Sequence, residues 1–222
     1  MRSPFSPVHL LVFTLALVLL LTFIQMELVK IAFGKLGMST SQGMLLLFAS
    51  LFGSALNLPF ASVRADPPEA QAETAARRSL LRMPVLPFTG RTIIAVNVGG
   101  CLVPVVFSAS LIHHFPLPAG DLLLTISLVA AVCHFLSRPV PGIGIGMPPL
   151  VAPIAAAIVA ISVNHELAAP LAYICGTLGV LIGADILRLG DVARLGTPVA
   201  AIGGAGTFDG IFLTGIVAVL LT

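Results

Sequence analysis

The chain has 222 residues, of which 58% are hydrophobic and only 9% are charged. Soluble domains carry about 25% charged residues, so this composition predicts one integral membrane domain over residues 1–222. The formal net charge of +2 gives no support to nucleic-acid binding. Three cysteines, all within apolar runs, argue for packing residues and against disulfides.

The apolar runs predict an all-α, polytopic transmembrane helical bundle of about seven spans. Each run approaches the roughly 20 residues that one crossing requires. The expected spans are residues 8–29, 43–63, 91–112, 119–137, 149–163, 167–187 and 198–222. We expect the first span to be retained, because it is longer than a signal-peptide core and no small-residue cleavage site follows it.

The charged residues predict the orientation of this bundle. With the N-terminus inside, the inner segments carry nine arginines and the outer segments carry two lysines. This asymmetry follows the positive-inside rule. We therefore expect a cytoplasmic N-terminus, a cytoplasmic loop over residues 64–90 and an external C-terminus.

Two glycine- and proline-rich breaks interrupt the expected helices, near residues 139–149 and 203–206. The first either enters the membrane as a re-entrant loop or is an ordinary turn before a short helix. The second could end where Thr207 caps a new helix, or its glycines could serve close packing. The candidate cavity-lining residues at the two breaks are Gly142, Gly144, Gly146, Pro148, Pro149, Gly203, Gly204, Gly206 and Thr207.

Asp209 is the most informative polar residue of the chain. An ionised carboxylate at membrane depth costs several kcal/mol unless it is protonated, paired or hydrated. No basic residue lies near Asp209 in the sequence. Asp185 is the second candidate, and it could instead be an interfacial residue paired with Arg188. If the last span were a straight helix, Asp209 would lie about 13 Å deeper than Asp185.

Other polar residues have a more ordinary interpretation. Asn57 and Asn97 are intramembrane amides, each followed by a proline, and they either stabilise helix packing or face a cavity. The histidines and acids expected outside match no metal-ligand spacing. Nucleotide-binding and hydrolase motifs are missing from the sequence, so we expect no cofactor.

Five segments together resemble one uncharacterised family, the prokaryotic membrane proteins filed as domain of unknown function sixteen-fourteen. This resemblance implies a polytopic protein of a prokaryotic cytoplasmic membrane and no particular activity. The segments are Gly53-Ser-x-x-Asn-Leu-Pro59, Asn97-Val-Gly-Gly-x-x-x-Pro104, Gly142-Ile-Gly-Ile-Gly-x-Pro-Pro149, Tyr173-x-x-Gly-Thr-Leu-Gly-Val-Leu-Ile-Gly-Ala-Asp185 and Gly203-Gly-Ala-Gly-Thr-Phe-Asp-Gly-Ile-Phe-Leu-Thr-Gly215.

A weaker resemblance links the run around Asp209 to intramembrane aspartyl proteases of the presenilin and signal-peptide-peptidase type. That resemblance implies catalysis by Asp209 and Asp185, although Asp209 stands two residues too late for Gly-x-Gly-Asp and Asp185 follows no aromatic residue. The first hypothesis is therefore an aspartyl dyad acting on a transmembrane peptide. The alternatives are a proton- or cation-coupled transporter or channel for a small solute, and a non-catalytic assembly protein, each with the lipid bilayer as its partner.

Overall fold

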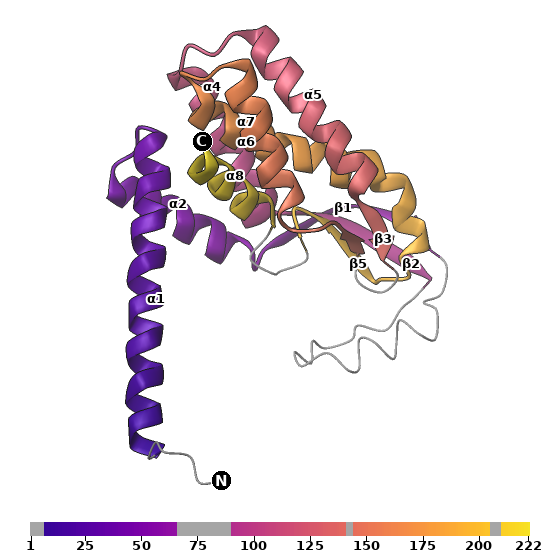
Figure 1. The fold of residues 1–222 in the computed structure, drawn as a ribbon. Helices are drawn as coiled ribbons and strands as arrows, with labels where there is room; N and C mark the ends of the chain where they lie inside the picture. The colour runs from indigo at the N-terminus through magenta and orange to yellow at the C-terminus, as the bar shows by residue number, and fades with distance from the viewer. Residues whose placement is uncertain (1–6, 66–89, 141–143, 205–209) are drawn as a thin grey trace.

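The computed structural model describes residues 7–65, 90–140, 144–204 and 210–222, and it combines a helical bundle with a small sheet (Figure 1). The helices are α1 (Pro7–Lys35), α2 (Thr40–Gly53), η1 (Val98–Leu102), α4 (Val103–His114), α5 (Ala119–Leu136), α6 (Val151–Val163), α7 (Ala168–Val180), η2 (Leu181–Asp185), η3 (Ile186–Arg194) and α8 (Gly210–Leu221). The strands are β1 (Asn57–Arg64), β2 (Arg91–Asn97), β3 (Arg138–Val140), β4 (Gly144–Gly146) and β5 (Val199–Ile202).

The first two helices form a bent arm beside the bundle. Figure 1 shows α1 projecting well beyond the other helices, and its final turns contact α2 and α8. The bend between the last part of α1 and α2 is 108°. Ser39 starts α2 through a capping box, in which its Oγ accepts the Gln42 N–H at 3.3 Å and Gln42 Oε1 accepts the Ser39 N–H at 2.9 Å.

A three-stranded sheet occupies one end of the molecule, with the order β1-β2-β5. β1 pairs with β2 antiparallel, and β5 pairs with β2 parallel. β1 is an edge strand, where Pro59 costs no ladder hydrogen bond, and its register shifts between Pro59 and Ala61. The helix η3 covers one face of this sheet, because Val192 and Leu195 pack on Ile94.

The prediction of an all-α fold is therefore wrong in three places. The segments 57–64, 91–97 and 199–202 were expected to lie within spans and are strands instead. The run Thr92-Ile-Ile-Ala-Val96 is rich in β-branched residues, which favour strands. A short apolar run of this kind cannot be assigned to helix or strand by hydropathy alone.

The bundle packs around α7. Leu171, Tyr173 and Cys175 of this helix are fully buried, and α5, α6 and α8 make extensive contacts with it. Two glycines in and directly after this helix lie against two different neighbouring helices. A Cβ added to Gly176 would lie 3.2 Å from Ala156 of α6, whereas one added to Gly183 in η2 would overlap the backbone of α5. Gly176 and Gly183 thus allow two different helices to approach closely, one near each end of the segment 168–185.

Within the described residues, two helices are long and apolar enough to cross a membrane, namely residues 119–136 and 168–194. The bent pair formed by residues 25–35 and 40–53 would be a third. The chain is therefore a mostly helical membrane protein with two or three such helices, and a bundle of seven full-length spans is not confirmed. The remaining apolar helices are shorter, and the 13 residues of α6 span about 20 Å.

The glycine- and proline-rich break near 139–149 includes a two-stranded antiparallel hairpin, β3 with β4, in which Arg138 is the Cα partner of Gly146. Pro148 and Pro149 follow the hairpin and precede the first turn of α6. Within the described residues, this break is therefore a short hairpin followed by the 13-residue helix α6.

Candidate functional site

Four of the five sequence signatures contribute side chains to one buried cluster, and the first signature is joined to the second by the hydrogen bond between Asn57 and Asn97. Cys101 of η1, Ala184 of η2 and Ile211 of α8 belong to one buried cluster, against which Met147 and Ile202 pack. We call the polar centre of this region the junction site. It consists of Ser54, Asn57, Asn97, Gly100, Cys101, Asp185 and Gly203.

Asn97 is the fully buried centre of the junction site. Its Nδ2 donates to the Ser54 carbonyl at 2.7 Å and to Asn57 Oδ1 at 3.0 Å. Its Oδ1 accepts the Gly100 N–H at 2.7 Å, which caps the start of η1. Asn57 and Asn97 are also Cα partners across β1 and β2. Both amides therefore link two strands and the start of η1, whereas the sequence placed them within membrane-spanning helices.

Gly203 sits on η1 in a position that only glycine can occupy. Its φ is +82°, and an added Cβ would lie 2.7 Å from Cys101 Cβ, Cys101 N and the Gly100 carbonyl carbon. Gly204 follows with a φ of +89°. These two left-handed residues turn the chain from β5 toward α8, so this glycine break is a tight turn packed on backbone.

Asp185 contacts this turn directly. Its Oδ2 accepts the Gly203 N–H at 2.8 Å, and its side chain is partly buried. Asp185 ends η2, which is a π-helical turn, and η1 on the other side of Gly203 is also π-helical. Such turns are rare and often occur at functional sites. The sequence predicted both residues as candidates and gave no sign that they touch.

Asp209, the most prominent sequence candidate, lies outside the described residues, as do Gly142, Gly206 and Thr207. Its neighbours in the chain are described on both sides. Gly203, six residues earlier, donates its N–H to the Asp185 carboxylate. Ile211, two residues later, is buried in the same cluster as Ala184.

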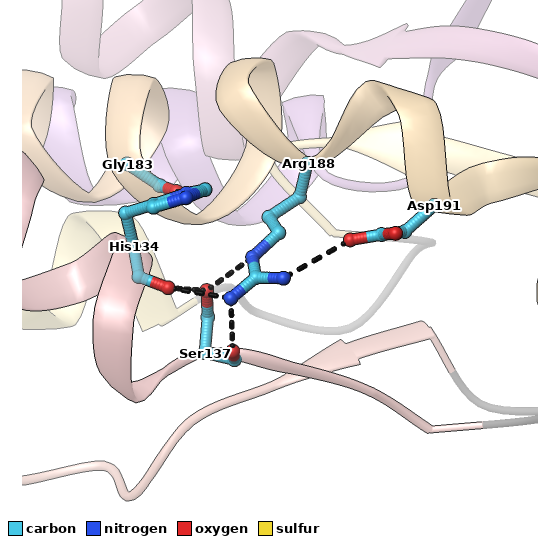
Figure 2. A network of polar contacts seen from close by, with 5 residues as sticks. All are labelled: His134, Ser137, Gly183, Arg188 and Asp191. Atoms are coloured by element: carbon cyan, nitrogen blue, oxygen red, sulfur yellow. Dashed lines mark hydrogen bonds and ion pairs between the residues drawn. The ribbon is translucent and has the colours of Figure 1, made fainter.

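Arg188 holds the end of α5 and was not predicted to do so. Its Nη2 donates to the carbonyls of His134 and Ser137 at 2.7 and 2.8 Å, and its Nη1 pairs with Asp191 at 3.1 Å (Figure 2). His134 Nδ1 also lies 3.3 Å from the Gly183 carbonyl oxygen. A cation at a helix C-terminus satisfies terminal carbonyls and complements the helix dipole. Arg188 is therefore a helix cap, whereas the sequence suggested a pair with Asp185.

Two buried hydroxyl groups mark the interior of the bundle. Tyr173 Oη and Thr177 Oγ1 are inaccessible, and their one close polar contact among the described residues is with each other, without the geometry of a full hydrogen bond. Both side chains border Gly215 of α8, where an added Cβ would lie 2.8 Å from each. Unsatisfied buried hydroxyls are uncommon and are often paired with ordered water.

The acids and histidines expected outside do not gather into a metal site. Asp121 instead accepts a hydrogen bond from Asn164 at 3.1 Å, which ties the start of α5 to the loop after α6. Across the described part of the chain, no three His, Cys, Asp or Glu side chains are arranged to hold a metal ion.

The fold and the junction site define a polytopic helical membrane protein with a small sheet at one end of its bundle. The chain belongs to the family described as Protein of unknown function (DUF1614), which matches residues 51–221. The matched range begins in α2 and includes every residue of the junction site. No curated protein and no solved structure matches the chain.

Proposed function

We propose that this membrane protein hydrolyses peptide bonds of transmembrane segments with an aspartyl dyad, Asp185 and Asp209. The observation that carries the proposal is the hydrogen bond from the Gly203 N–H to Asp185 Oδ2. It ties one carboxylate to the base of the segment that bears the other. In such a dyad one carboxylate activates water while the other protonates the leaving amide.

The sequence raises one difficulty for this dyad, because it places the two carboxylates at different depths in the membrane. A straight helix from residue 198 would bury Asp209 about 13 Å deeper than Asp185. The chain instead forms β5 over Val199–Ile202 and starts α8 at Gly210. Asp209 therefore directly precedes a helix that contacts η1, the same element on which Gly203 packs, and this supports similar depths for the two carboxylates.

Single and double variants test the dyad in purified protein. We expect Asp185→Asn and Asp209→Asn each to slow cleavage of a model transmembrane peptide by about 10²–10⁴-fold. The double variant should be no slower than the worse single variant, because two groups that act as a unit are not additive. Asp191→Asn is the matched control, since Asp191 pairs with Arg188 and lies outside the junction site. Full cleavage by Asp185→Asn would disprove the dyad.

A proton- or cation-coupled transporter or channel for a small solute is the second candidate. The buried hydroxyls of Tyr173 and Thr177 favour it, because they would suit a hydrated path through the bundle. In this case Asp209→Asn alone would abolish proton flux in vesicles, and Asp185→Asn would have a mild effect. If neither variant alters cleavage or flux, the protein is a non-catalytic assembly component.

The orientation is part of the proposal. Arg64, Arg91 and Arg138 lie at the strand ends, and this end would face the cytoplasm under the positive-inside rule. Lys35 Nζ donates to the Val219 carbonyl at the other end of α8, where the C-terminus lies. In the seven-span orientation that we propose, each of the seven α-helices of the described residues would make one crossing, and two or three of them are long enough to cross alone. Reporter fusions at residue 75 and after residue 222 should then report opposite sides of the membrane.

A further inference from the structure

The β1–β2 ladder ends on two arginines that face each other. Arg64 and Arg91 are Cα partners at the last register position of this antiparallel pair, and both are exposed. Residues directly opposite in such a pair have Cβ atoms about 5 Å apart and project to the same face. Like charges in this position destabilise the strand pair. An anion held between the two guanidinium groups would remove that repulsion.

The described part of the chain does not supply this anion. Its two ion pairs are Lys30 with Glu27 and Arg188 with Asp191, and neither involves the cross-strand arginines. Of the two aspartates near the sheet, Asp191 is committed to Arg188 and Asp185 accepts the N–H of the turn after β5. Among the described residues, no carboxylate is therefore paired with Arg64 or Arg91.

The face that carries these arginines is open and partly apolar. Ile93 lies two residues from Arg91 on the same face of β2 and is 43% exposed. The opposite face is covered by η3 through Ile94. In β1, Phe60 is also 59% exposed. A surface that places apolar side chains beside a pair of cations, at one end of a membrane bundle, is suited to the region of the bilayer where acyl chains meet headgroups.

We propose that Arg64 and Arg91 together bind the phosphate of one anionic phospholipid headgroup. Two guanidinium groups can each offer paired N–H donors to phosphate oxygens. Charge complementarity selects this occupant, because anionic lipids surround a membrane protein on the side where its arginines gather. This proposal rests on the orientation proposed above and does not depend on the aspartyl dyad.

Binding of phosphatidylglycerol to the purified chain tests the site. Native mass spectrometry in detergent gives the lipid affinity, and the shift of the thermal midpoint gives the stabilisation. We expect Arg64→Gln and Arg91→Gln each to weaken phosphatidylglycerol binding about fivefold and to reduce the lipid-induced midpoint shift. Arg194→Gln is the control, because it removes an exposed arginine of η3 that has no cross-strand partner. It should bind the lipid as the unmodified chain does.

The variant Arg91→Glu distinguishes loss of lipid binding from loss of folding. The new carboxylate would face Arg64 across the ladder, so this variant should melt no lower than the unmodified chain in a zwitterionic detergent. It should nevertheless lose the midpoint shift with phosphatidylglycerol. Equal lipid affinity in the double variant Arg64→Gln with Arg91→Gln would overturn the proposal. Equal stabilisation by inorganic phosphate would also overturn it, because the site would then not select a lipid.

Discussion

Replacing Gly203 by alanine tests the packing that holds the junction site together. At this position φ is +82°, and a Cβ would overlap the backbone of η1 at Gly100 and Cys101. The left-handed conformation costs an L-residue about 1–2 kcal/mol. Overpacking against neighbours that cannot move away costs about 1–3 kcal/mol. We therefore expect Gly203→Ala to lower the free energy of unfolding by about 2–5 kcal/mol.

Alanine substitutions at two other glycines separate the conformational cost from the overpacking cost. Gly90 has a φ of +77° with open space around its Cβ position, so Gly90→Ala carries only the conformational cost of about 1–2 kcal/mol. Gly190 has neither a positive φ nor a neighbour within 4 Å. Gly190→Ala should be neutral or stabilise the chain by about 0.4–1 kcal/mol through the unfolded state.

Unfolding in mixed micelles, followed by far-ultraviolet circular dichroism, measures all three alanine variants under the same conditions. The expected order of stability is Gly190→Ala, then Gly90→Ala, then Gly203→Ala. If Gly203→Ala is no less stable than Gly90→Ala, the turn after β5 does not pack on η1 and the reasoning for the junction site fails.

Three further substitutions probe separate contacts by the same unfolding measurement. Asn97→Ala should cost about 2–4 kcal/mol, because it leaves buried backbone groups of α2 and η1 without partners; a cost below that of a surface substitution would contradict the role of this amide. Arg188→Gln should cost about 1–2 kcal/mol by uncapping α5, and Asp191→Asn, which breaks only a partly exposed ion pair, should cost less. Gly183→Ala should cost about 1–3 kcal/mol against the α5 backbone, whereas Gly120→Ala meets nothing within 4 Å and should be neutral.

The membrane character and the helical core of this protein could be predicted because both depend on composition and on run length. The α5 and α7 segments fall on expected spans. The sheet could not be predicted in the same way. Hydropathy reports burial, and Thr92-Ile-Ile-Ala-Val96 is equally apolar as a strand or as a helix.

The polar candidates could be selected from the sequence, but their partners could not. Asn57 and Asn97 shared a pattern in the sequence, yet their hydrogen bond depends on a strand pairing that closes over 40 residues. Asp185 was expected beside Arg188 because three residues separate them on one helix. The change from π- to 3-10-helix at Asp185 alters that helical geometry, and its carboxylate contacts Gly203, 18 residues away.

Cysteine cross-linking measures most directly whether the two aspartates meet. In a background without the three native cysteines, Asp185→Cys and Asp209→Cys are combined, and the chain is oxidised in membranes. A disulfide requires Cα atoms within about 7 Å, so the account predicts rapid cross-linking of this pair. The pair Asp191→Cys with Asp209→Cys serves as the control and should remain reduced. Failure of the first pair to cross-link in a folded chain, or preferential cross-linking of the control pair, would contradict the proposed dyad.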